Sequence, residues 1–556
     1  MAVLGFQLIL TIVVLWILNK FTAKYSFAQW LLLKGGLVRY LHPTNERLKE
    51  TISNGNVDPH TTHKCDKPSK NQTSGKKSGS TRRRGTKSGS YQDDAQKVES
   101  FNVPRTLTLA LDYEPLGKYY VMQLPFYSDL QWLLDFSFCT LIVYFTTEMY
   151  YTYFGQKEAV IEYNLALIWC FLAFGFALKI LFSITATYFR GGNEAMGERS
   201  MCIVSGCFFF LISMVVLIPA EDILEFGLVE AHQTFVNNTR KLLEFQGVAE
   251  QSSGPVSQLI FRFWLAIACG LLGAILTFPG LRVSKMHKDT LTYSEGNKFQ
   301  SAIYNLSFIS PLFIILFWIK PIARNYLTVR EWMTPETFEA TRLIFILVVL
   351  ALRVSLFRKY IQSYLNIAPQ RLSYLRKESG KITNLEIQKM IARVSYYLCV
   401  ASLQFFGPIL LCLFLTLLTK STGNYRWTGS WLNQTNCSND MCPVPDLNTL
   451  SSQSFLVNNE INETISNDEF INQTIIEDSL DLINAGNASN FTADLNATGE
   501  QVQTEQDIAK ISLSLLKDVF NPLVFRGVIG FLLWWTVATW FSTQAIGFMY
   551  HSYFED

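Results

Sequence analysis

The chain has 556 residues, of which 49% are hydrophobic, 14% aromatic and only 17% charged, and its formal net charge is +2. Its mean hydropathy is +0.18. A soluble chain of this length would divide into several globular domains, and these figures exclude an ordinary soluble protein. The apolar residues instead fall into runs of about 20 residues, which suits passage through a bilayer. We therefore expect the lipid bilayer as the chain's environment and no nucleic-acid partner.

Nine runs are expected to be transmembrane helices, because backbone polar groups in lipid must be hydrogen-bonded within the segment. The predicted fold class is all-α, a polytopic integral membrane helical bundle with the N-terminus outside and the C-terminus cytosolic. Two of the runs are short and are expected to start earlier or to tilt. The nine runs cover roughly 2–18, 130–152, 165–187, 201–219, 258–280, 303–319, 342–357, 395–418 and 523–547.

The first transmembrane helix, 1–18, is followed by a basic linker over 19–126. Lys20 and Lys24 follow the helix and no basic residue precedes it, which favours an N-terminus outside and a cytosolic linker. Within the linker, 27–41 is apolar but interrupted by charges and glycines, so we expect an interfacial or re-entrant segment.

The linker stretch 51–100 is poor in apolar residues and is predicted to be disordered. His60, His63 and Cys65 within it have a spacing that could suit a metal ion. No second ligand pair lies nearby, so we expect no metal and no cofactor.

The region 127–420 is predicted to be a bundle of seven transmembrane helices, and three ionisable residues lie inside its spans. Asp135 and Glu148 are on the second span, and Lys179 is near the middle of the third. Such residues are costly in hydrocarbon and usually face a bundle interior or a cavity. The depths of Asp135 and Lys179 differ by roughly 5 Å, so we hypothesise that they pair. A purely stabilising role is the favoured interpretation, and a polar pathway lined by the three residues is the alternative.

Other charges lie near the ends of spans. Arg262 and Arg526 are expected close to Glu148 at the outer face, where they form a second cluster or extend to the lipid headgroups. Arg353 is expected to extend to the headgroups from the inner end of the seventh span.

Small residues on the fifth span suggest close helix packing. Ala266, Gly270 and Ala274 recur every four residues, with Gly273 beside them. We expect this strip to pack within one chain, with a homodimer as the alternative. The strip ends at Pro279, which is expected to stop or kink the helix.

The charges of the loops assign a side to each of them. The loops 281–302 and 358–394 are rich in lysine and arginine, which predicts a cytosolic position. The loop 220–256 falls outside, begins with acidic residues and holds a glycosylation acceptor site at Asn237. The loop 320–341 also falls outside although it carries Lys320, Arg324 and Arg330, against the rule.

The loop 421–515 sets the orientation of the whole chain. From 421 to 509 it holds one basic residue, Arg426, against 13 acidic ones, and it predicts an extracellular or lumenal loop. Cys437 and Cys442 are expected to form a local disulfide there. The last transmembrane helix and a short cytosolic tail are assigned to 516–556. The loop's glycosylation acceptor sites are Asn433, Asn436, Asn462, Asn472, Asn487, Asn490 and Asn496.

Familiar enzyme signatures, such as nucleophile elbows, zinc-binding helices and nucleotide-binding glycine loops, are missing from the sequence. No soluble domain exists to house ordinary chemistry, so we expect a protein that is not an enzyme. An intramembrane enzyme built on paired carboxylates is the third and least favoured class.

Several strings of residues resemble the transmembrane protein 161 family. The resemblance covers most spans and inner loops, and it fails over about 50–105 and 430–515. The strings are Gln131–Tyr151 (QWLLDFSFCTLIVYFTTEMYY), Gly197–Ser200 (GERS), Leu276–Arg282 (LTFPGLR), Ser307–Arg324 (SFISPLFIILFWIKPIAR) and Phe525–Trp535 (FRGVIGFLLWW).

The resemblance implies a eukaryotic polytopic membrane protein that helps to maintain electrical excitability, including cardiac rhythm, by restraining potassium and calcium currents. No catalytic residues come with it. The first function class is therefore a non-enzymatic regulator of ion homeostasis that acts on ion channels or calcium-handling proteins. The second is a transporter, channel or lipid-handling protein. Either would reside in the plasma membrane or the endoplasmic reticulum.

Overall fold

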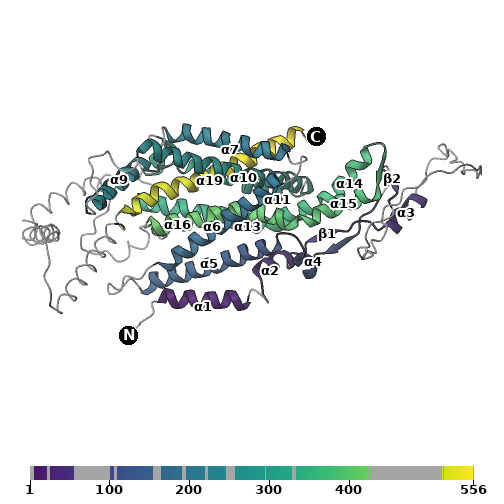
Figure 1. Ribbon diagram of the computed structural model, residues 1–556, viewed down its shortest axis with the longest axis horizontal. Helices are drawn as coiled ribbons and strands as arrows, with labels where there is room; N and C mark the ends of the chain where they lie inside the picture. Colours follow the sequence, from purple (N-terminus) through teal and green to yellow (C-terminus); the bar gives the residue numbers. More distant parts are fainter. Residues whose placement is uncertain are drawn as a thin grey trace, which may run out of the picture.

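The computed structural model is a bundle of long helices that run side by side, with its two termini at opposite ends (Figure 1). It describes residues 6–21, 25–54, 100–105, 109–154, 164–190, 196–218, 223–245, 257–294, 296–328, 333–423, 425–427, 516 and 519–554. Eight described helical segments are long and apolar enough to span a bilayer. The predicted all-α polytopic fold is confirmed. The eight segments contain α5 (Tyr127–Phe154), α6 (Leu165–Arg190), α7 (Met196–Leu217), α10 (Gln258–Tyr293), α11 (Lys298–Leu316), α13 (Pro335–Leu365), α16 (Leu398–Thr422) and α19 (Pro522–Phe554).

The first apolar run forms a shorter helix, α1 (Phe6–Phe21), that lies along α5 (Figure 1). The Phe6 ring stacks on Tyr150 of α5 at 4.0 Å between centroids. Gln7 ties α1 to both neighbouring helices, because its amide donates to the Tyr151 hydroxyl at 2.8 Å and its carbonyl accepts from the Leu165 amide at 2.5 Å. Together with the eight longer segments, α1 is a ninth helix of the described bundle.

The helix α16 lies at the centre of the bundle. It contacts α5, α6, α10, α13 and α19. In the most apolar 18-residue stretch of its segment 94% of residues are buried, against 22% for α7, which therefore lies at the periphery. A side chain at Gly407 of α16 would place its Cβ 2.5 Å from Cδ2 of Leu181 in α6, so a larger residue there would require Leu181 to move.

The strip of small residues on α10 packs against α7 of the same chain. A Cβ at Gly270 would lie 2.9 Å from Cβ of Phe210, and one at Gly273 would lie 2.5 Å from the Phe209 ring. Ser205 of α7 also hydrogen-bonds Thr277 of α10 at 2.7 Å. The strip thus serves contact between two helices of one chain, as expected.

Prolines do not end the helices that hold them. Of the two outcomes expected at Pro279, a stop or a kink, the stop is excluded because α10 continues to Tyr293, and the kink remains a prediction. In α11, Pro311 cannot donate to the carbonyl of Ser307, four residues earlier. The Ser310 hydroxyl donates to that carbonyl at 2.9 Å instead, so the helix keeps its backbone satisfied.

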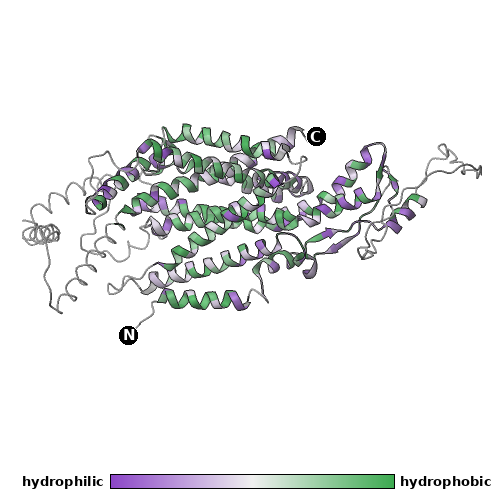
Figure 2. Cartoon of the chain, in the orientation of Figure 1, coloured by the Kyte–Doolittle hydropathy of each residue, from purple (hydrophilic) through white to green (hydrophobic). Residues whose placement is uncertain are grey.

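The polar ends of the bundle carry shorter elements, and Figure 2 shows hydrophilic residues concentrated there, around an apolar middle. We call the end with α14 and α15 the inner end and the opposite end, with α9, the outer end, following the predicted sidedness. The elements are α2 (Phe27–Leu33), α3 (Asn45–Asn54), α4 (Lys118–Met122), α9 (Leu228–Phe245), η2 (Lys320–Arg324), α12 (Asn325–Thr328), α14 (Ile367–Lys377) and α15 (Asn384–Tyr396).

Two small antiparallel sheets fix the described parts of the predicted linker to the inner end. In the first, β1 (Val38–Tyr40) pairs with β3 (Tyr113–Pro115), with Arg39 opposite Glu114. In the second, β2 (Asn102–Pro104) pairs with β4 (Lys381–Thr383) between α14 and α15. These strands are not predictable from the local sequence, because each is three residues long and its partner is remote in the chain. Of the segment predicted to be disordered, 51–100, residues 51–54 instead form the end of helix Asn45–Asn54, and 55–99 lie outside the described residues.

Candidate functional site

Asp135 holds the short helix α2 against the bundle. Its side chain is 6% exposed, and one carboxylate oxygen accepts hydrogen bonds from the Ser26 hydroxyl and the Ala28 amide, each at 3.1 Å. Ser26 is also the N-cap of α2, where its hydroxyl accepts from the Gln29 amide. A carboxylate beside a helix N-terminus interacts favourably with the unpaired amides of the first turn. Asp135 therefore anchors the segment that we predicted to be interfacial.

The predicted pairing of Asp135 with Lys179 is wrong. Lys179 is exposed on the surface of α6, whereas Asp135 faces α2, and the ion pairs of the described residues include neither. Sign and depth suggested the pair, but the direction in which each helix presents its side chain decides contact. The predicted intramembrane cluster of Asp135, Glu148 and Lys179 is therefore not assembled.

Glu148 forms an ion pair with Lys420 near the outer end of the bundle. The Lys420 side chain is 11% exposed, and its ammonium also lies 5.7 Å from the ring centroid of Trp427. Arg526 binds just beyond the same end of α16, where it donates to the Gly423 carbonyl at 2.5 Å. Glu148 and Arg526 thus both bind at the C-terminal end of α16. Arg262, partly exposed on α10, makes no hydrogen bond or ion pair with the residues that the structure describes.

A partly buried carboxylate, Glu225, pairs with one of the basic residues in the loop that departs from the positive-inside rule. Glu225 pairs with Arg324 and lies 3.9 Å from Arg342. The Arg342 guanidinium also covers the Trp318 ring at 4.4 Å. The Glu225 amide donates to the Trp318 carbonyl at 3.1 Å, which holds the Glu225 backbone beside Trp318. The sequence signals for this cluster were basic residues in one outer loop and acidic residues at the start of another.

Arg353 is buried inside the bundle, so the expectation that it reaches the headgroups is wrong. It is 4% exposed. It donates to Oε1 of Gln544 at 3.0 Å and to the Phe308 carbonyl at 3.4 Å, and its guanidinium lies 4.2 Å from the Trp540 ring centroid. An oxygen acceptor from each of two helices and an aromatic face replace water around the charge.

A histidine lies in the same part of the bundle. Nδ1 of His287 is 3.0 Å from the Tyr360 hydroxyl, and its ring stacks on Phe308 at 4.5 Å. Both His287 and Tyr360 are almost fully buried. No sequence signal marks His287, Tyr360 or Gln544, because uncharged polar residues in apolar helices carry no distinctive spacing.

These features define a polytopic helical membrane protein whose inward-facing charges are held by partners at the helix contacts. The chain belongs to the transmembrane protein 161A/B family, since the family model described as predicted transmembrane protein 161AB matches residues 2–555. The predicted family membership is confirmed. No solved structure matches the chain.

The predicted glycosylation acceptor sites and the predicted disulfide cysteines lie in two parts of the chain. Asn237 lies exposed on α9. The other acceptor sites and the cysteine pair Cys437 and Cys442 belong to 428–515, outside the described residues.

Proposed function

We propose that this protein is a non-enzymatic regulator of ion homeostasis and membrane excitability. It restrains potassium and calcium currents through ion channels or calcium-handling proteins in the plasma membrane or the endoplasmic reticulum. Family membership supports this role at the level of the cell. The observation that supports regulation, as opposed to conduction by this chain, is the packed centre of the bundle.

The centre of the bundle is filled along α16. Leu411, Cys412, Phe414 and Leu417 have no exposed surface, and Gly407 touches Leu181 of α6. An ion in transit needs polar groups that replace its hydration shell. Leu411, Phe414 and Leu417 offer none, and the buried hydroxyl of Thr416 donates to the Cys412 carbonyl of its own helix, which supports regulation of another protein's current over conduction by this chain.

The loop 421–515 determines which side of the membrane each end of the bundle faces in this proposal. It is proposed to be extracellular or lumenal, with N-linked glycans on its seven acceptor sites and a disulfide between Cys437 and Cys442. Removal of N-glycans should shift the apparent mass of the protein from cells. A chain with Gln in place of the seven acceptor asparagines should lose most of that shift, and an unchanged shift would contradict the sidedness.

One observation favours the alternative of a transporter, channel or lipid-handling protein. Arg353, Gln544, His287 and Tyr360 put polar groups inside the bundle, where intramembrane ionisable residues commonly mark a pathway. The hydrogen bonds among them give these groups a structural purpose as well. Regulation therefore remains the proposal, and ion flux through the wild-type protein that is lost in an Arg353 variant would reverse it.

The test is to record whole-cell potassium and calcium currents in cells that lack the protein and in cells that express it again. We expect larger currents in its absence and a return to the original amplitude on re-expression. A Gly407→Leu variant is the matched control, because its side chain would overlap Leu181 and should prevent correct folding. Unchanged currents in the cells that lack the protein would overturn the proposal.

A further inference from the structure

A cavity of about 530 Å³ opens at the inner end of the bundle, between α15 and the segment around β1. Its volume falls within the range of about 300–1,000 Å³ that is usual for small-molecule sites. Its lining residues include the basic Arg39, Lys389 and Arg393 and the aromatic Tyr120, Tyr396 and Tyr397. No acidic side chain is among the described residues that line it.

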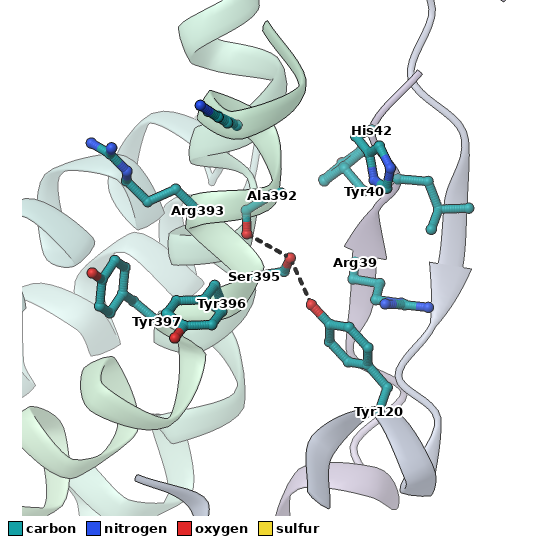
Figure 3. Close-up of a pocket in the computed structure, with 11 residues that line it drawn as sticks. Arg39, Tyr40, His42, Tyr120, Ala392, Arg393, Ser395, Tyr396 and Tyr397 are labelled. Carbon is teal, nitrogen blue, oxygen red and sulfur yellow. Dashed lines mark hydrogen bonds between the residues drawn. The ribbon is translucent and has the colours of Figure 1, made fainter. Parts of the chain in front are cut away.

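The two walls of the cavity come from segments that are remote in sequence. Figure 3 shows α15 facing β1, with Tyr120 reaching across to Ser395. The Tyr120 hydroxyl donates to Oγ of Ser395 at 2.9 Å, and Ser395 in turn donates to the Ala392 carbonyl at 3.1 Å. This bridge fixes α4 to α15, so the cavity is formed before any ligand binds.

The positive charges of the cavity are only partly neutralised. Arg39 pairs with Glu114 at 2.7 Å and lies over the Tyr120 ring at 3.7 Å from its centroid. Lys389 and Arg393 are exposed and form no ion pair with a residue that the structure describes. Two cations with no ion-pair partner in the described part of the chain, one helical turn apart on α15, favour an anionic ligand.

The cavity lies where the chain enters its apolar core. Tyr396 and Tyr397 directly precede α16, and they are 50% and 43% exposed. In Figure 3, Arg393 and Tyr397 extend from the side of α15 away from β1, so the basic and aromatic surface continues beyond the cavity. Tyrosines are typical of the level of the lipid headgroups.

We propose that this cavity binds the phosphorylated headgroup of an anionic lipid in the adjacent leaflet. Basic pockets at the cytosolic ends of transmembrane helices are suited to such headgroups, because lysine and arginine meet the phosphates while apolar helices receive the acyl chains. The partly exposed tyrosines supply the boundary between the two environments. The inference goes beyond the proposed function and does not depend on it.

The test is binding of a fluorescent short-chain phosphatidylinositol bisphosphate to the full-length protein in neutral detergent. We expect saturable binding that short-chain phosphatidylcholine does not compete away. Lys389→Gln with Arg393→Gln should weaken binding on the order of twentyfold, because each cation near a lipid surface contributes about a fivefold change in affinity. The pair Arg376→Gln and Lys381→Gln is the matched control, with the same loss of charge on exposed inner-end residues outside the cavity.

Three results would overturn the inference: no saturable binding, equal weakening by both double variants, or equally tight binding of free inositol trisphosphate. The last result would assign the cavity to a soluble phosphate compound. Thermal unfolding without lipid should be the same for wild type and both double variants, because all four substituted side chains are exposed. If the double variant also unfolds at a lower temperature, Lys389→Arg separates the effect of charge from that of stability. This variant keeps the charge and should keep binding, and a loss of binding in it would count against the inference.

Discussion

Arg353 of α13 and Gln544 of α19 meet inside the bundle, with the guanidinium donating to the amide oxygen at 3.0 Å. Neither residue reaches solvent, since they are 4% and 0% exposed. The hydrogen bond joins two helices that the chain separates by 191 residues. It therefore couples the last helix to the rest of the bundle.

Removing one partner of this pair should be costly. Gln544→Leu takes an oxygen acceptor from a buried cation, and we expect a loss of stability of about 2 kcal/mol. Arg353→Met with Gln544→Leu should lose less than the sum of the single variants, because no buried charge is left in need of an acceptor. Thermal unfolding of the purified protein measures this, and strict additivity would contradict the proposed coupling.

Loss of Asp135 should release α2 without unfolding the bundle. Asp135→Ala removes the acceptor for Ser26 and Ala28, so amide hydrogen exchange over residues 26–33 should become at least about tenfold faster. Lys179→Met is the control and should leave exchange there unchanged. Equal effects of the two substitutions would restore the pairing of Asp135 with Lys179.

The pair of Glu148 and Lys420 should tolerate exchange of its charges. Glu148→Lys alone places two cations together and should lower stability by about 1 kcal/mol. Adding Lys420→Glu should recover most of that loss, as judged from unfolding temperatures. Because the pair is partly exposed, its contribution should fall at high salt. A double variant as unstable as the single one would show that the ion pair does not join α5 to α16.

Close packing of α10 on α7 predicts a strict size limit at Gly270. Gly270→Val should destabilise the protein by about 2 kcal/mol, since its side chain would overlap Phe210 and the Gly206 carbonyl. Gly175→Val is the matched control, because nothing lies within 4 Å of a Cβ at that position. Comparison of their unfolding temperatures tests the contact, and equal losses would argue that only helix propensity is involved.

The outer end should be sensitive to alkaline pH through Tyr425. Burial raises the pKa of Tyr425 above its usual value of 10.0, with a smaller contribution from Glu339, although nearby arginines oppose the shift. The folded protein thus holds the phenol proton more tightly than the unfolded chain. This stabilisation is complete below pH 10 and is lost as the pH rises through the folded pKa. Tyr425→Phe should therefore unfold at a less pH-dependent temperature above pH 10, and an unaltered pH profile would contradict the assignment.

The sequence was sufficient for the class and the approximate spans, because apolar runs of membrane length are rare in soluble proteins and typical of transmembrane helices. The run at 395–418 corresponds to α16 (Leu398–Thr422) and the run at 130–152 to α5 (Tyr127–Phe154). Hydropathy alone could not identify α16 as the central helix, since helices that face lipid and helices that face other helices are equally apolar.

The polar contacts were predictable only in part. Small residues correctly indicated a close contact on α10. The partners of Asp135 and Arg353 were missed, because they depend on helix rotation and on a neighbouring helix far away in the sequence. In the sequence, Ser26 and Gln544 are ordinary polar residues, and only the fold places them beside Asp135 and Arg353. Sequence position determined the depth of each charge in the membrane and left its direction open.

The most direct test of the account is ion flux through the purified protein in liposomes. With potassium or calcium gradients and a fluorescent reporter of each ion, we expect flux no greater than in protein-free liposomes, because apolar side chains fill the bundle along α16. Flux well above that level, lost in Arg353→Met but kept in Lys179→Met, would contradict the account. It would make the protein itself the conductor of the current.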